Sequence, residues 1–184
     1  MKKETVDNEQ RLIAGCKRGE SWAQKEVYEK YSPAMLALCV RYVSDYESAK
    51  DVLQEGFIKL FTKIEQYEGR GSFGGWIRKI FVNTALEELA NNKMLNPYVS
   101  MERLPDYPDD IDLYQIEQVS ANDLLECIKE LPSRSRVIFN MYAIEGYTHA
   151  EIAQKLGIKE NSSRAQFSRA RKFLQESVLK LMKK

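Results

Sequence analysis

Apolar residues recur at intervals of three and four along most of this chain, and no segment shows the strict alternation that would predict a strand. The pattern therefore predicts an all-α protein. The helices expected from it span residues 9–18, 21–31, 33–43, 45–66, 72–93, 120–131 and 133–144. Pro132 separates the last two of these helices, because proline lacks the backbone N–H that would continue the helical ladder.

The helix expected over residues 45–66 has one apolar side and one acidic side. Its spacing predicts a buried stripe made of Val52, Leu53, Gly56, Phe57, Leu60, Phe61 and Ile64. Asp51, Gln54 and Glu55 lie off this stripe and are expected to face outward. On residue types alone, such an edge is usually no more than a solvated surface.

The helical periodicity breaks down between residues 96 and 119. This segment contains three of the chain's five prolines and has six acidic residues against a single Arg. Proline and net negative charge favour an extended connection over a packed element. We therefore predict two small helical domains, residues 9–95 and 120–184, joined by a flexible acidic linker. A second interpretation is that the linker imitates nucleic acid inside a basic channel.

The most informative pattern lies near the carboxyl end of the chain. Thr148 and Glu151 have the spacing of a capping box, and Gly157 can adopt the left-handed conformation that ends a helix. A second helix follows, and residues 160–184 contain seven Lys or Arg against two Glu. This arrangement predicts a helix-turn-helix whose second helix enters the major groove of DNA. The alternative is an ordinary helical hairpin with a solvated basic face.

Residues 67–79 mix aromatic rings, cations and glycines, a combination that can stack an unpaired base while contacting its phosphates. The candidates for such contacts are Arg70, Phe73, Arg78 and Lys79. Trp76 continues the apolar helical spacing of the residues after it, so we expect it to be a core anchor instead.

Composition adds exclusions rather than a function. The 184 residues carry a formal net charge of +1, so overall charge gives no evidence for nucleic-acid binding. One His, three scattered Cys and no Gly-rich phosphate loop argue against an enzyme, a zinc site or a disulfide framework, and no cofactor is expected. The amino terminus lacks the apolar core of a secretion signal, and no apolar run approaches the roughly 18 residues of a membrane span. We therefore expect a cytoplasmic protein.

Motifs in both halves resemble one family, the extracytoplasmic-function sigma factors of bacterial RNA polymerase. Residues 12–20 resemble the family's opening helix, and residues 51–61 resemble its polymerase-binding helix. Residues 71–85 are similar to the segment that opens and reads the minus-ten element, and residues 131–171 resemble the minus-thirty-five-binding domain. Each motif alone is moderately specific, and their order and separation make the joint resemblance strong.

The resemblance implies a promoter-specificity subunit without catalytic activity, and it assigns roles to particular residues. Asp51, Gln54 and Glu55 would face the clamp helices of the polymerase's largest subunit. Phe73 and Asn83 would sit by the extruded minus-ten base, next to the cations Arg70, Arg78 and Lys79. The minus-thirty-five contacts would come from Thr148, Arg164, Ala165, Ser168, Arg169 and Arg171. The implied partners are core RNA polymerase, promoter DNA and a sequestering anti-sigma factor, and the free protein is expected to be a monomer.

Some residues depart from the family pattern. The family usually has basic residues after the Asn83 segment, whereas here Glu87, Glu88, Ala90, Asn91 and Asn92 leave Lys93 as the nearby cation. Each lost phosphate contact weakens DNA binding, so the first domain is expected to grip duplex DNA less firmly. Gly74 and Gly75 replace bulkier residues at the start of a helix, and Ala165 stands where serine is frequent.

Two other functions fit parts of the pattern. A stand-alone helix-turn-helix repressor or activator would use the first lobe to sense a ligand or to dimerise, and it would bind a twofold-symmetric operator by itself. A protein-interaction adaptor that has lost promoter activity would explain the depleted basic segment at residues 87–92.

Overall fold

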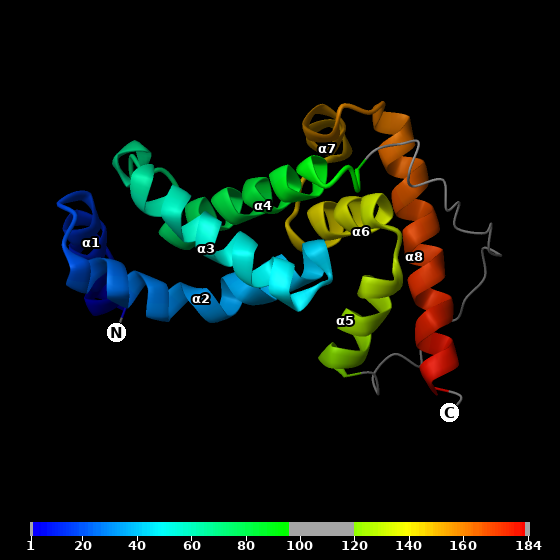
Figure 1. Cartoon of the computed structure of the whole chain (residues 1–184), viewed down its shortest axis with the longest axis horizontal. Helices are drawn as coiled ribbons and strands as arrows, with labels where there is room; N and C mark the ends of the chain where they lie inside the picture. The colour runs from blue at the N-terminus through cyan, green and yellow to red at the C-terminus, as the bar shows by residue number, and fades with distance from the viewer. Residues whose placement is uncertain (1, 96–119, 183–184) are drawn as a thin grey trace. The chain divides into compact units, whose positions relative to one another are not determined.

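The computed structural model describes residues 2–95 and 120–182, and within these ranges every regular element is a helix (Figure 1). The all-α prediction is confirmed. The chain divides into two compact units, Met1–Leu89 and Ala90–Lys184. The predicted acidic linker, residues 96–119, lies outside the described residues.

The first unit is built from four α-helices and one short 3-10 turn. These are α1 (Lys2–Lys17), α2 (Ser21–Val43), α3 (Tyr46–Thr62), the turn η1 (Ile64–Gln66) and α4 (Phe73–Asn91). The core holds large side chains from three of the helices, among them Val27, Leu38, Tyr42, Leu60, Phe73, Ile77, Phe81 and Leu89. No described helix of the chain is both long enough and apolar enough to cross a membrane.

The structure differs from the sequence prediction at Pro33. α2 runs without interruption through this proline, where the sequence pattern predicted two helices. A proline inside a helix costs about 3 kcal/mol because its ring displaces a hydrogen bond. Val27 and Met35, on either side of Pro33, are buried, whereas Pro33 itself is exposed. Packing of both halves of the helix therefore outweighs the local cost.

A close contact between α3 and α4 sets the geometry of the first unit. The Phe81 ring of α4 lies against the α3 backbone at Gly56, so near that a Cβ atom at Gly56 would stand 2.5 Å from the ring. Phe57 packs edge-on against the same ring, with centroids 5.1 Å apart. Because Gly56 has no side chain, α4 can approach α3 at this point, and the residues off the buried stripe of α3 remain outside.

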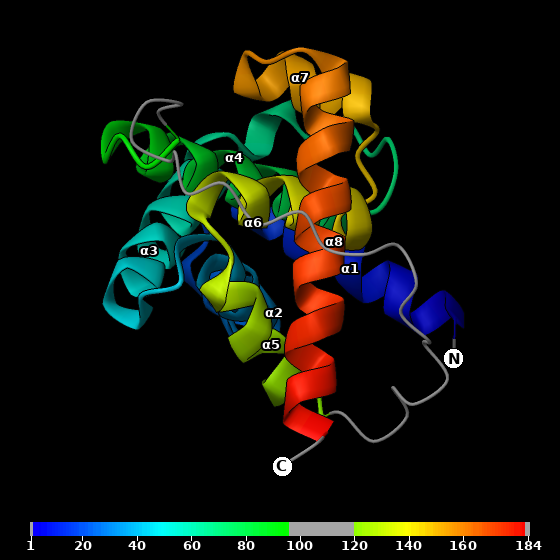
Figure 2. The ribbon, with the colours of Figure 1, turned by 90° about the vertical axis from the view of Figure 1, so that its right-hand side faces the viewer.

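The second unit contains the helices that the sequence predicted, with one division. They are α5 (Ala121–Glu130), α6 (Ser133–Phe139), the π-helical turn η3 (Asn140–Ile144), α7 (His149–Leu156) and α8 (Glu160–Met182). The helix expected over 133–144 is therefore an α-helix followed by a π turn. Figures 1 and 2 show α8 running beside α5, α6 and α7, each of which contacts it. Its buried side consists of Ala170, Leu174 and Val178, which pack with Cys127, Ile128 and Leu131.

The buried side chain of Arg136 joins α5 to α6. Its Nη1 donates hydrogen bonds to the backbone oxygens of Lys129 (2.8 Å) and Leu131 (3.2 Å), at the end of α5. Burial lowers the pKa of Arg136 to about 10, so the guanidinium is still charged at neutral pH. Carbonyls at a helix carboxyl end carry partial negative charge, and a cation there stabilises the corner at Pro132.

Replacing Gly56 with alanine tests the α3–α4 contact. The added methyl group must displace Phe81, so we expect Gly56→Ala to destabilise the first unit by about 1–3 kcal/mol, measured by urea unfolding followed through tryptophan fluorescence. Both tryptophans, Trp22 and Trp76, lie in this unit.

Gly74→Ala is the matched control. The nearest atom to its added Cβ, on Tyr31, is 3.4 Å away, and alanine is the better helix former, so this variant should be neutral or slightly stabilised. Equal losses in the two variants would contradict the assigned contact.

Candidate functional site

The outer face of α3 carries the polar residues that the sequence singled out. Asp51, Gln54 and Glu55 are all exposed, while Val52 and Leu53 beside them are buried. Residues at these positions share one side of a helix, so the three side chains form one surface.

Ile58 extends this surface and was missed in the sequence analysis. Its side chain is 53% exposed, and it lies seven residues after Asp51 and three after Glu55, on the same side of α3. The sequence carried a signal, because Ile58 is the apolar residue of this segment that falls off the buried stripe. An exposed isoleucine among polar residues is typical of a protein-binding surface.

Lys59 stands between the α3 surface and α4. Its Nζ lies 2.6 Å from Oε2 of Glu87 on α4 and 3.4 Å from Oε1 of Glu55 on its own helix. Burial acts to lower the pKa of Lys59, but the bonds to Glu87 and Glu55 outweigh it and raise the pKa. Lys59 is therefore charged and links the two carboxylates.

The loop between η1 and α4 is held by hydrogen bonds at its base. Lys17 Nζ donates to the backbone oxygen of Tyr67 (3.0 Å), and Tyr67 Oη donates to the backbone oxygen of Gly71 (2.9 Å). Gly69 and Gly71 both have φ of 77°, a conformation that favours glycine. Arg70 projects from this loop with its side chain 89% exposed and contacts Glu68.

The prediction that Phe73 is available for contact is wrong, because its side chain is fully buried. Its ring packs against Tyr31, Tyr67 and Trp76, with centroids 5.8, 5.1 and 6.0 Å away. Phe73 is the first residue of α4, and its ring turns into the core rather than toward the loop. Trp76, expected to be the core anchor, is partly exposed and covers Phe73.

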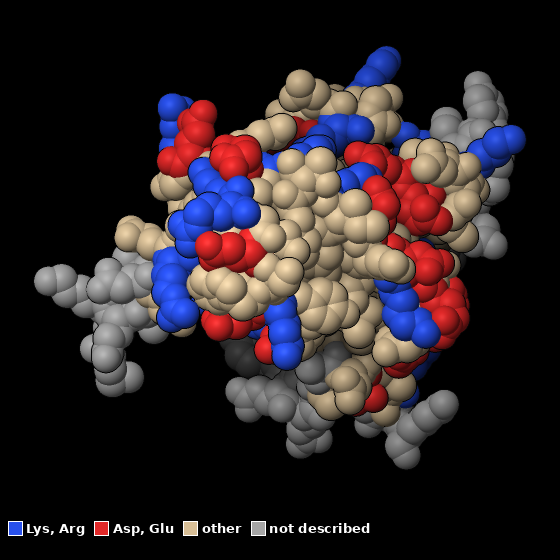
Figure 3. Space-filling model, turned by 60° about the vertical axis from the view of Figure 1, so that its left-hand side comes forward, with Lys and Arg blue, Asp and Glu red and all other residues tan. Residues whose placement is uncertain are grey.

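Along α4, the exposed surface changes from basic to acidic. Arg78, Lys79 and Asn83 are exposed near its beginning, and Glu87 is exposed one turn later. The cations predicted for the minus-ten segment are therefore on the surface. Figure 3 shows basic and acidic side chains interspersed over the face in view, in keeping with the net charge of +1.

The helix-turn-helix of the second unit forms as predicted. Glu151 N donates to Thr148 Oγ1 (3.2 Å), and Thr148 N donates to Glu151 Oε2 (2.8 Å), which completes the capping box. Gly157 ends α7 in the left-handed conformation, with φ of 62°. α7 and α8 pack together across this turn.

The outward side of α8 presents the predicted recognition residues. Arg164, Ala165, Ser168 and Arg169 are exposed, whereas Ser163 and Ala170 between them are buried. Arg164 Nη2 lies 2.5 Å from Oε1 of Glu160, one turn earlier. The guanidinium of Arg164 is thus held by a carboxylate that an incoming phosphate or base would have to replace.

His149 fastens α7 to α8 inside this unit. Its Nδ1 is 2.9 Å from the hydroxyl of Ser163, which is fully buried. Its ring stacks on Tyr142 (centroids 4.2 Å apart, interplanar angle 11°) and meets Phe167 at 5.7 Å. Burial, and then the charge of Arg164, lower the pKa of His149, partly offset by Glu160. This cluster was not foreseen in the sequence.

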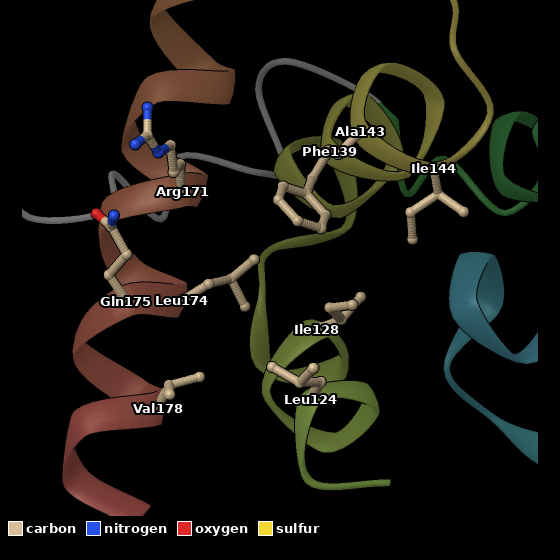
Figure 4. Close-up of a pocket in the computed structure, with 9 residues that line it drawn as sticks. All are labelled: Leu124, Ile128, Phe139, Ala143, Ile144, Arg171, Leu174, Gln175 and Val178. Atoms are coloured by element: carbon tan, nitrogen blue, oxygen red, sulfur yellow. The ribbon is translucent and has the colours of Figure 1, made fainter. Parts of the chain in front are cut away.

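An apolar groove of about 430 Å³ opens between α5, η3 and α8 (Figure 4). Leu124 and Ile128 of α5 face Leu174 and Val178 of α8 across it. Arg171, predicted to contact DNA, is exposed but lies along the α8 side of this groove, at the margin of the recognition face.

Two protein-family models match the chain, one in each unit. Sigma-70 region 2 matches residues 27–94, and Sigma-70 region 4 matches residues 121–174. Together the two segments cover well over half of the sequence. The region 2 match accounts for the first unit, which a stand-alone helix-turn-helix regulator leaves unexplained.

Curated relatives match over nearly the whole length. The RNA polymerase sigma-H factor of Pseudomonas aeruginosa is 28% identical over 97% of this chain and 98% of its own. The ECF RNA polymerase sigma-E factor of Haemophilus influenzae is 26% identical over 95% of this chain and 97% of its own. This chain belongs to the extracytoplasmic-function sigma factors. It is accordingly a non-enzymatic initiation factor that binds core RNA polymerase and directs transcription from promoter DNA.

The fold of this sigma factor is also found in a solved structure. The sigma factor RpoE of Bartonella quintana, in complex with the anti-sigma factor NepR, aligns with a TM-score of 0.53 at 20% identity, over 85% of this chain and 96% of that one. The likeness shows a shared all-α arrangement.

Acidification tests the role of His149. Its pKa is lowered in the folded state from the usual 6.5, so the unfolded chain binds the proton more readily. The contribution of His149 to stability is therefore complete above about pH 6.5 and declines as the pH falls below it. We expect hydrogen–deuterium exchange in α7 and α8 to accelerate between about pH 6.5 and about pH 5, after correction for intrinsic exchange rates.

His149→Phe keeps the stacking on Tyr142 but cannot titrate, so it provides the control. This variant should lose the pH dependence in that window. An unchanged profile would show that other groups cause it.

Proposed function

We propose that the two units of this sigma factor divide the work of promoter recognition. A region 2 domain, residues 9–95, binds core polymerase and the minus-ten element, and a region 4 domain, residues 120–184, binds the minus-thirty-five element. The acidic segment 96–119 joins them as a linker. The free protein is a cytoplasmic monomer that binds promoters weakly until polymerase fixes the spacing of the two domains.

The observation that carries this proposal is the composition of the exposed side of α3. Gln54 and Glu55 offer hydrogen-bond acceptors and charge, Asp51 adds a second carboxylate, and Ile58 supplies 53% of its side-chain area to contact. A mixed patch of this kind, on a helix fixed by the core, suits docking against a basic helical partner.

For the minus-ten element, the support lies in the cations and the amide at the exposed start of α4. Arg78 and Lys79 can bind strand phosphates, and Asn83 can hydrogen-bond a base edge. Arg70 reaches outward from the adjoining loop. Phe73 acts differently from the sequence expectation: it supports this surface from beneath through Tyr67 and Trp76 and does not itself stack on a base.

For the minus-thirty-five element, the exposed residues of α8 favour major-groove reading. Arg164 and Arg169 can pair with guanine edges or phosphates, and Ser168 lies between them. Thr148 is occupied as the α7 cap, so its contribution would come from the helix amino terminus that it stabilises. Arg171 would contact the DNA backbone from the margin.

The structure of RpoE with NepR suggests regulation by a protein partner. NepR is an anti-sigma factor bound to RpoE, which shares the fold of this chain. By that analogy, an anti-sigma factor sequesters this sigma factor until a signal releases it. Purification of the tagged chain from its native host, with and without stress, would show whether a single stoichiometric partner is lost on induction.

Paired substitutions test the division of labour. Gln54→Ala with Glu55→Ala should weaken core-polymerase binding by about tenfold or more, since truncated interface residues at a docking centre cost upward of about 1 kcal/mol each. Binding of the isolated region 4 surface to minus-thirty-five duplex should not change. Arg164→Ala with Arg169→Ala should do the reverse, at about 1–3 kcal/mol for each base contact.

The matched control is Lys25→Ala with Glu29→Ala, an exposed ion pair on α2 away from all the proposed surfaces. It should leave both affinities unchanged. If each pair of substitutions affected both assays equally, the division would be refuted.

Removing Glu160 tests how Arg164 is used. Glu160→Gln releases Arg164 from its ion pair and removes a negative charge near the DNA, so we expect tighter binding to minus-thirty-five duplex, by about two- to fivefold at moderate salt. Fluorescence anisotropy over a salt series would measure it. Glu176→Gln, on the same helix but several turns away, should have a smaller effect, and a weaker complex with Glu160→Gln would show that Arg164 does not engage DNA.

A further inference from the structure

Glu87 lies on α4 among residues that the family uses for DNA, yet its carboxylate is turned to α3. Its Oε2 is 2.6 Å from Lys59 Nζ, the shorter of the two contacts that this amine makes with carboxylates in the described chain. The Lys59 side chain is only 23% exposed, so its amine has little room to move away from the groups that surround it.

The second carboxylate on Lys59 belongs to the proposed docking surface. Glu55 lies 3.4 Å from the same amine, on the preceding turn of α3, and its side chain is 52% exposed. Glu87 and Glu55 therefore compete for one cation. Whichever carboxylate holds Lys59 more closely leaves the other with more of its negative charge available to a third group.

We propose that Glu87 is a positioning residue for polymerase docking, which acts by holding Lys59 away from Glu55. The proposal rests on the proposed function, in which Glu55 contacts core polymerase. With Glu87 present, Lys59 bonds chiefly across to α4, and Glu55 can meet a basic side chain of the polymerase. Without Glu87, Lys59 closes on Glu55 as an (i, i+4) pair and neutralises the carboxylate that docking needs.

This role explains an acidic residue on a surface where negative charge works against DNA. A carboxylate at this place repels phosphate and weakens duplex binding. The contact with Lys59 gives Glu87 a function on the other side of α4. The Gly56–Phe81 contact keeps α4 close enough to α3 for the two side chains to meet.

The experiment measures the affinity of the full-length sigma factor for core polymerase in three backgrounds. Glu87→Gln should weaken binding by about two- to fivefold, the range expected for exchange of an exposed ion pair. In a Lys59→Met background, which keeps the apolar stem and removes the competing cation, Glu87→Gln should have no effect. In a Glu55→Gln background its effect should also vanish, because the carboxylate through which it acts is absent.

Two further readouts separate positioning from general stability. The loss with Glu87→Gln should shrink as salt is raised, since it arises from charge, while thermal unfolding of the first unit should be nearly unchanged. Glu87→Asp, which keeps the charge on a shorter side chain, should restore part of the affinity.

The proposal is overturned if Glu87→Gln weakens polymerase binding equally with Lys59 and with Met at position 59, or if it changes DNA binding alone. The docking proposal fails separately: in that case the Gln54→Ala and Glu55→Ala pair would leave polymerase affinity unchanged, whatever Glu87 does.

Discussion

The first unit depends on the contact between the Phe81 ring and the α3 backbone at Gly56. Packing a ring directly on a backbone brings two helix axes closer than any larger residue at position 56 would permit. The approach buries one side of α3 and leaves Asp51, Gln54, Glu55 and Ile58 on the other. It also brings Glu87 to Lys59. A docking surface and the charge that tunes it therefore share one steric origin.

The second unit reaches a comparable result with polar and aromatic groups. Arg136 closes the corner between α5 and α6, and the capping box at Thr148 starts α7. His149 then joins α7 to α8 by its hydrogen bond to Ser163 and by stacking on Tyr142. Since a buried polar pair loses much of its value if either partner moves, this cluster fixes the angle at which the recognition helix leaves the turn.

Charge is arranged locally in this sigma factor rather than as one basic field. Arg164 is held by Glu160, Lys59 by Glu87 and Glu55, and Arg70 by Glu68. Such pairs reduce nonspecific attraction to DNA, because each cation must exchange a carboxylate for a phosphate. Weak binding by the free protein suits a subunit that should engage promoters after it has joined the polymerase.

The helices, the capping box, the left-handed Gly157 and the outward polar edge of α3 were predicted correctly because each depends on residues within a few positions of one another. Local spacing determines them. The continuity of α2 through Pro33, the burial of Phe73 beneath Trp76, the His149–Ser163 bond and the pairing of Lys59 with Glu87 were decided by tertiary structure. In each of these, the energy comes from atoms that are distant in sequence, and no periodic pattern records which of them will meet.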